Sequence, residues 1–241
     1  MKLLRSCKLN ILQWRINPKY AFVAMYMVLY MWYETQGFVA YSRALGYPVR
    51  PWLFPLLPCD PGNFVPIFLA FVLLVSDAPF RNRQQQFVLL RVGKGAWIGG
   101  QLMYILFTSV VFTAALWLLS WIFLLPNLAW GNDWGPVLTT TAVAGGQWDY
   151  NAPLILSYGC MTSATPLEAT LWVAGVMIAV CFLLGEIMVV CNLWARKGAG
   201  AVVVSGFSIL PLVISVFAYA PRLTKRLLWI SPVSWLDRSL M

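Results

Sequence analysis

Apolar residues gather along this chain in long runs that short polar stretches separate. About 20 apolar residues in a helix match the hydrocarbon thickness of a bilayer, so such runs predict membrane-spanning helices. We predict five spans, at about 20–39, 62–80, 96–125, 168–193 and 199–220. The second is the weakest, because its unbroken apolar core, 64–75, would extend only about 18 Å as a helix.

Composition supports the same class. The 241 residues are 61% hydrophobic and only 10% charged, whereas soluble domains average about 25% charged residues. We therefore expect an all-α integral membrane protein, a single transmembrane domain over residues 1–241 formed by a bundle of five to six helices. The chain contains no histidine, which excludes His-dependent membrane proteases, His-ligated haem and His-bearing zinc or di-iron sites. We expect no catalytic residue and no metal site.

Positive charge predicts the orientation. Most of the 17 Lys and Arg residues fall before the first run, between the second and third, or between the fourth and fifth: Lys2, Arg5, Lys8, Arg15, Lys19, Arg81, Arg83, Arg91, Lys94, Arg196 and Lys197. The positive-inside rule places these segments, with the N-terminus, in the cytoplasm of a multi-pass plasma-membrane protein. The basic residues at 222–238 would lie outside, against the rule. The basic residues are dispersed, so we expect contact with the lipid bilayer and none with nucleic acid.

The N-terminal segment, 1–19, has its own apolar pattern. Leu4, Cys7, Ile11 and Trp14 recur at intervals of three and four residues, opposite Lys2 and other basic residues. This pattern predicts an amphipathic helix in the cytoplasmic interface, and the alternative is a disordered basic leader.

The segment between the second and third apolar runs is longer and more regularly patterned in apolar and polar residues than a simple turn between two helices needs to be. Asp77 can cap a helix and Pro79 suits a first turn. Apolar and polar side chains alternate around the helix that would follow: Phe80, Arg81, Arg83, Gln84, Phe87, Leu90, Arg91 and Val92. The segment predicts a docking helix for a cytoplasmic partner, and the alternative is an interfacial loop that obeys the positive-inside rule.

Three features together resemble the permease subunits of ABC-2 type ABC transporters, particularly the small bacterial ones that pair with separate ATPases. They are the basic N-terminal helix, the stretch SDAPFRNRQQQFVLLRVGKGAWIGGQ, and WISPVSW after the fifth run. In that family the second feature is the coupling helix. The third corresponds to a re-entrant outer hairpin that leads into a sixth span. No sixth run follows here, so the resemblance implies either a truncated span or a half-inserted outer segment at 221–241.

The resemblance also implies partners and a function. A second permease copy or related chain would complete the membrane domain, and cytoplasmic ATP-binding subunits would contact the coupling helix. No Walker A pattern is present, because Gly93-Lys94 lacks the earlier glycine at the required spacing. ATP and Mg would therefore belong to the partner ATPase, and this chain would need no cofactor and be no enzyme. The resemblance implies export of an amphipathic, peptide or lipid-like substrate.

Glu186 lies inside the fourth run, where a lone carboxylate is unfavourable by about 3 kcal/mol at mid-depth. It is a candidate for the substrate path or for proton binding. The alternative is an acid tolerated through a hydrogen bond to a neighbouring helix or through protonation.

Cys59 and Cys160 both fall in predicted outer loops, where oxidation is permitted. A disulfide between them is a further hypothesis.

A second functional class fits the same patterns. The chain could be a membrane sensor or assembly subunit that does not transport and that signals through the cytoplasmic loop at 77–95. Nucleotide-dependent movement of a substrate separates the two functions.

Overall fold

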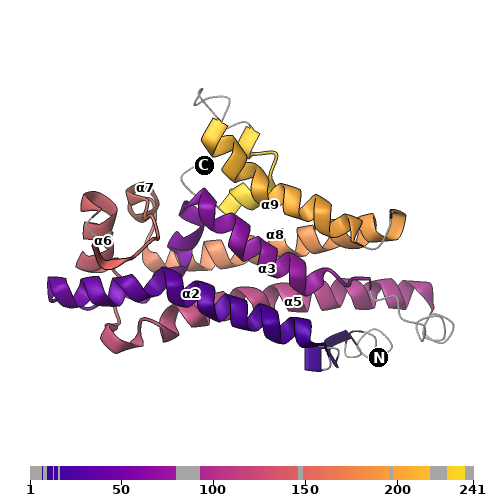
Figure 1. Cartoon of the computed structure of the whole chain (residues 1–241), viewed down its shortest axis with the longest axis horizontal. Coiled ribbons are helices and arrows are strands. Elements are labelled where there is room, and N and C mark those ends of the chain that lie inside the picture. The colour runs from indigo at the N-terminus through magenta and orange to yellow at the C-terminus, as the bar shows by residue number, and fades with distance from the viewer. Residues whose placement is uncertain are drawn as a thin grey trace.

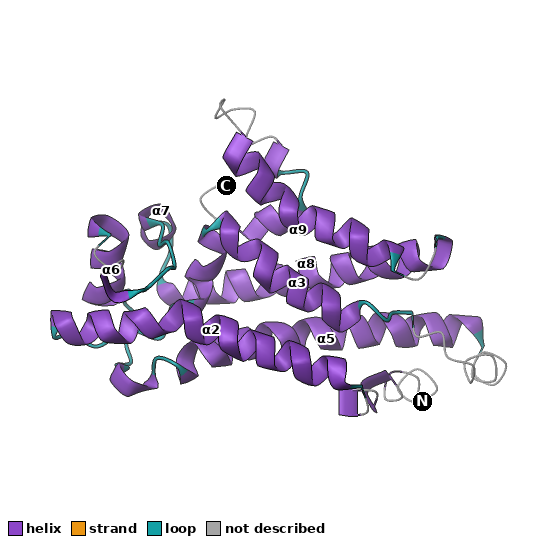
Figure 2. Cartoon of the chain, viewed as in Figure 1, coloured by secondary structure: helices purple, strands orange, loops and turns teal. Residues whose placement is uncertain are grey.

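Helices form most of the structure, a computed structural model that describes residues 7, 10–12, 14, 15, 17–79, 93–145, 149–195, 198–217 and 227–236. No strand occurs among these residues, only one isolated β-bridge between Val49 and Leu128 (Figure 2). The α-helices are α2 (Pro18–Leu45), α3 (Phe64–Val75), α5 (Lys94–Ile122), α6 (Gly135–Ala144), α7 (Tyr158–Thr162), α8 (Pro166–Trp194) and α9 (Ala199–Phe217). Short 3-10 helices are η1 (Phe54–Cys59), η2 (Pro61–Asn63), η3 (Leu125–Asn127) and η5 (Pro232–Leu236).

The five longer helices alternate in direction (Figure 1). The start of α2, the end of α3, the start of α5 and the junction of α8 with α9 lie at one end, which we call the basal end. Helices α6 and α7 lie at the other, which we call the cap end. The most extensive packing joins α5 to α8, α3 to α9, and α8 to α9.

Three helices of the described residues, α5, α8 and α9, are long and apolar enough to cross a membrane. Their positions match the predicted runs at 96–125, 168–193 and 199–220. Helix α2 has 28 residues but carries more polar side chains, and α3 has only 12 residues, with the chain leaving the helix after Val75. In the described part of the predicted span 62–80, the α-helix therefore covers only residues 64–75.

Local sequence explains where the helices begin and end. Asn17 caps α2 by accepting a hydrogen bond from the Lys19 N–H at 3.0 Å, directly before Pro18 in the first turn. The same helix ends at Gly46, whose φ of 72° suits a glycine at this position. Thr165 and Glu168 form a capping box at the start of α8.

Close helix packing depends on two glycines. A Cβ on Gly185 would lie 2.3 Å from Ile105 Cγ2, and a Cβ on Gly200 would lie 2.4 Å from the Met188 carbonyl oxygen. These positions bring α8 against α5 and α9 against α8. Small residues permit such approaches between membrane helices.

Described residues from both terminal segments pack against this bundle. In the predicted interfacial segment 1–19, residues 7, 10–12, 14 and 15 are helical, Asn17 is extended, and Cys7 and Asn10 are buried. Beyond α9, η5 packs against α8 and α9, and Ser231 Oγ donates to the Phe207 carbonyl oxygen at 2.8 Å. The described part of the predicted outer segment, 227–236, thus folds back onto the bundle.

Candidate coupling site

The residues predicted to bind a cytoplasmic partner divide into two groups. Asp77 and Pro79 are described and lie at the basal end, directly after α3. The other six predicted residues lie outside the described part of the chain: Phe80, Arg81, Arg83, Gln84, Phe87 and Arg91. The structure therefore describes the residues on either side of 80–92, with Pro79 before this segment and Gly93 after it.

Asp77 is ion-paired to α2. Lys19 Nζ lies 2.5 Å from Asp77 Oδ2 and donates to Ser76 Oγ at 3.2 Å. The same ammonium group lies 5.0 Å from the centre of the Tyr20 ring, within the range of a cation–π contact. The ion pair is partly exposed, so its stabilising effect is about 1 kcal/mol or less, but it fixes the end of α3 beside the start of α2.

Asn192, near the end of α8, makes the second connection. Its Nδ2 donates to the Ala78 carbonyl oxygen at 2.7 Å, and its Oδ1 accepts from the N–H groups of Gly198 and Gly200 at 3.1 and 2.9 Å. The side chain is buried. One amide therefore joins the residue that follows Asp77 to α8 and to the start of α9.

An aromatic cluster completes the basal end. Trp14 Nε1 donates to the Tyr104 hydroxyl at 3.0 Å, and the hydroxyls of Tyr20 and Tyr104 lie 3.3 Å apart. The rings of Trp14 and Tyr20 stack at 5.7 Å between centres. These contacts join the N-terminal segment and α2 to α5, whose first residue is Lys94. In the same N-terminal segment, burial raises the pKa of the Cys7 thiol above its ordinary value.

Two acidic side chains are buried within long helices. Glu186 is partly buried on α8, and its Oε1 atom is inaccessible to solvent with no hydrogen-bond partner among the described residues. Glu34 is only 5% exposed on α2. The structure brings neither residue into the basal junction of Lys19, Asp77 and Asn192.

An ion pair and two hydrogen bonds join two loops at the cap end. Arg50 Nη2 lies 2.9 Å from Asp133 Oδ1, and Arg50 Nη1 donates to the Trp130 carbonyl oxygen at 2.6 Å. Trp52 Nε1 donates to the Gly131 carbonyl oxygen at 2.6 Å. The loop before η1 therefore holds the loop before α6.

The two candidate cysteines meet at this same end. Cys59, the last residue of η1, and Cys160, in α7, have their sulfur atoms 2.7 Å apart.

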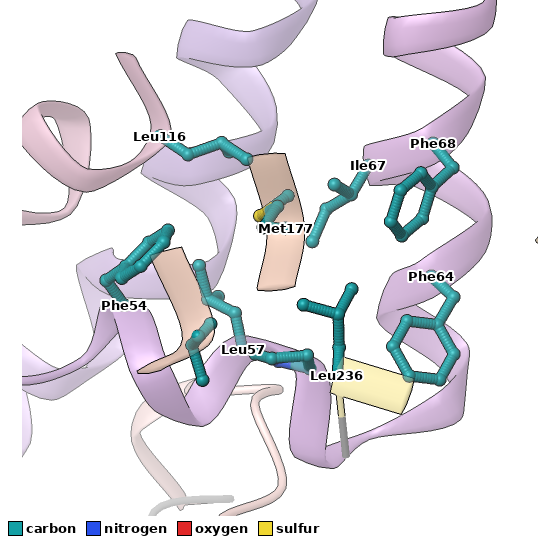
Figure 3. Close-up of a pocket in the computed structure, with 10 residues that line it drawn as sticks. Phe54, Leu57, Phe64, Ile67, Phe68, Leu116, Met177 and Leu236 are labelled. Atoms are coloured by element: carbon teal, nitrogen blue, oxygen red, sulfur yellow. The ribbon is translucent and has the colours of Figure 1, made fainter. Parts of the chain in front are cut away.

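A small apolar pocket lies between η1, α3, α5, α8 and η5 (Figure 3). Leu236 of η5 lies between Leu57 and Phe64 in this view. The cavity volume is about 10 Å³, which is the space that one water molecule needs. This pocket is therefore a small packing gap in the core and is too small to hold a substrate. No group of three or more His, Cys, Asp or Glu among the described residues is arranged to hold a metal ion.

Comparisons with protein-family models, curated proteins and solved structures found no match to this chain.

Sequence reasoning found Asp77 but missed Lys19 and Asn192 as its neighbours in the junction. In the sequence, Lys19 was one of many basic residues that the positive-inside rule explains. Asn192 lies among apolar residues in VVCNLW, and an amide near the end of an apolar run was the signal that the sequence offered. Its three backbone partners come from segments up to 114 residues away, which no local pattern reveals.

Proposed function

We propose that this chain is the permease subunit of an ATP-driven ABC transporter of the ABC-2 type. In this proposal α2, α3, α5, α8 and α9 cross the plasma membrane, with the basal end in the cytoplasm and the cap end outside, as the positive-inside rule predicts. Helix α2, about 42 Å long, exceeds the hydrocarbon thickness, and the short α3 crosses with η2 and the residues that flank it. ATP and Mg bind the separate cytoplasmic ATPases, and a second permease copy or related chain completes the membrane domain.

The observation that carries the proposal is the pair of connections at Asp77 and Ala78. Lys19 joins Asp77 to α2, and Asn192 joins Ala78 to α8 and α9. After residues 80–92, which we call the coupling segment, Gly93 leads directly into α5. A force applied to residues 80–92 is therefore delivered to four long helices at their basal ends.

This arrangement suits a subunit that converts movement of a partner into movement of its helices. A ligand shifts a conformational equilibrium only through contacts that differ between two states, and closure of an ATPase pair supplies that difference. The contacts at Asp77 and Ala78, and the direct junction of Gly93 with α5, are the paths by which that difference would reach the helices.

The substrate class rests on the resemblance alone. The exposed apolar side chains of the long helices, among them Phe22, Leu106, Leu171 and Val202, are those that lipid would contact. We propose an amphipathic, peptide or lipid-like substrate that is exported, with Glu186 as a polar point on its path.

Purification in a mild detergent from the native cell, followed by mass spectrometry, tests the proposal. We expect P-loop ATPase chains in stoichiometric amounts with the wild-type protein. We expect their loss in the variant Arg81→Glu/Arg83→Glu and their retention in Arg43→Glu, a charge reversal on the exposed Arg43 near the cap end of α2.

Intact protein that lacks any ATPase and carries a different stoichiometric partner would overturn the transporter proposal. That outcome would favour the sensor or assembly subunit. ATPase binding that survives reversal of both arginines would remove the coupling role from 80–92.

A further inference from the structure

The two cysteines at the cap end come from segments that are far apart in the sequence. Cys59 and Cys160 are 101 residues apart, and their sulfur atoms lie 2.7 Å from each other. Cys160 is buried, whereas Cys59 is partly exposed. Of the pair, Cys59 is therefore the sulfur that a reagent or a redox partner reaches first.

The surroundings hold both backbones in place. Residues 54–58 of η1 are buried in the bundle. The Cys160 N–H donates to the Ser157 carbonyl oxygen at 3.2 Å, and Ser163 Oγ donates to the Cys160 carbonyl oxygen at 3.0 Å. Trp134 Nε1, next to α6, donates to the Ala164 carbonyl oxygen at 3.3 Å, just beyond α7.

The cysteine pair lies where the cap meets the bundle. Trp134, Ala169 of α8 and Leu236 of η5 line the same small pocket as both cysteines, and its cavity volume is about 10 Å³. Residues 125–145 and 149–165, which we call the cap, contain α6 and α7 and lie between α5 and α8 in the sequence. The Arg50–Asp133 pair holds the first part of the cap, and the cysteines lie at its last part.

We propose that Cys59 and Cys160 form a disulfide that fastens the cap to η1, so that the redox state of this pair controls whether the last part of the cap can lift from the bundle. The proposal rests on the orientation given under the proposed function, which puts the cap end outside the cytoplasm, where disulfides persist. It does not depend on transport.

The chemistry is thiol–disulfide exchange with an oxidising protein disulfide outside the membrane. The Cys59 thiol loses its proton, and its sulfur attacks one sulfur of that disulfide to give a mixed disulfide and a free thiolate on the oxidant. The Cys160 thiolate then attacks Cys59 sulfur and displaces the second thiolate of the oxidant. The S–S bond between Cys59 and Cys160 replaces the bond in the oxidant, which leaves as a dithiol after taking up the two protons.

Differential alkylation of the wild-type protein tests whether the bond exists. Membranes are denatured in N-ethylmaleimide, reduced, and treated with an isotopically heavy form of the reagent. We expect heavy label on Cys59 and Cys160 and light label on Cys7, Cys181 and Cys191. Light label on both members of the pair would overturn the proposal.

A membrane-impermeant maleimide distinguishes the absence of the disulfide from an error in the proposed membrane orientation. In intact cells of the variant Cys160→Ser, we expect the reagent to modify Cys59 from outside. Modification from outside together with light label in the wild type would remove the disulfide and leave the orientation standing. Modification only after the cytoplasm is opened would overturn both.

Hydrogen exchange in the purified protein tests the fastening. We expect peptides covering 152–162 to exchange several-fold faster after reduction, and equally fast in Cys59→Ser/Cys160→Ser without reductant. Peptides from α5 serve as the internal reference. Equal exchange at 152–162 in the oxidised and reduced protein would show that the bond does not hold the cap.

Discussion

Asn192 satisfies three backbone groups at the point where the coupling segment leaves the bundle. Its amide accepts from Gly198 and Gly200 and donates to Ala78. The buried position means that water cannot replace these bonds when the side chain is removed.

Replacing Asn192 with Ala should destabilise the protein, because it leaves buried donors and an acceptor without partners. Each such group costs roughly 1–3 kcal/mol. The expected result is a clear drop in the thermal unfolding temperature in mild detergent. Ser215→Ala is the matched control, since that exposed hydroxyl bonds only to the Leu212 carbonyl oxygen of its own helix. Equal unfolding temperatures for the two variants would contradict this role.

The Lys19–Asp77 pair should contribute less. Its side chains are 21% and 29% exposed, so a double-mutant cycle with Lys19→Met and Asp77→Asn should give a coupling energy of about 1 kcal/mol or less. The cycle is measured by thermal unfolding at low and at high salt, and salt should reduce the coupling. A coupling of several kcal/mol that salt leaves unchanged would mean that the pair is more deeply buried than described.

At the scale of elements, helices approach each other closely at glycines, because a larger side chain at these positions would push the helices apart. Gly200 lies against the backbone of α8 at Met188, whereas Gly206, two turns further along α9, has no atom within 4 Å of its would-be Cβ. The same helix therefore offers one glycine that is needed for packing and one that is not.

Gly200→Ala should destabilise the protein by about 1–3 kcal/mol, because the new methyl group meets a carbonyl oxygen that cannot move alone. Gly206→Ala should have the opposite sign and stabilise by up to about 1 kcal/mol, because alanine favours the helix more than glycine does. Thermal unfolding of both variants checks the pair. A stabilised Gly200→Ala protein would contradict the close approach of α9 to α8.

The sequence was sufficient for the three most apolar helices, because an uninterrupted apolar run of membrane length has few alternatives to a helix. It was insufficient for α6 and α7. Helix α6 begins Gly-Pro and contains three consecutive threonines, which have weak helical propensity, so the predicted outer loop showed no helical pattern. The cysteine pair was within reach of sequence reasoning because both residues lay in loops on one side, whereas the Asn192 bonds required the folded chain.

At the scale of the whole molecule, an ion pair lies at each end, Lys19–Asp77 at the basal end and Arg50–Asp133 at the cap end. The ends differ in what accompanies the pair. The buried amide of Asn192 joins separate segments at the basal end, and Cys59 and Cys160 lie together at the cap end.

The two ends should lie on opposite sides of the membrane. Single cysteines at Gly95, which is exposed with no neighbour within 4 Å of its would-be Cβ, and at Val143, which is 71% exposed on α6, report on them in a cysteine-free background. In intact cells we expect an impermeant maleimide to modify the residue at 143 and to reach the residue at 95 only after permeabilisation. Modification of both from the same side would mean that α5 does not cross.

The most direct test of the central claim measures whether ATP in the partner moves the helices of this chain. Spin labels at Gly95 on α5 and at Val202, which is 75% exposed on α9, report the separation of these helices at the basal end in the purified complex with its ATPase. We predict that the distance distribution shifts when ATP and vanadate trap the closed ATPase, and that Asn192→Ala weakens the shift. An unchanged distribution in a complex that hydrolyses ATP would contradict the proposal that the coupling segment transmits closure to the spans.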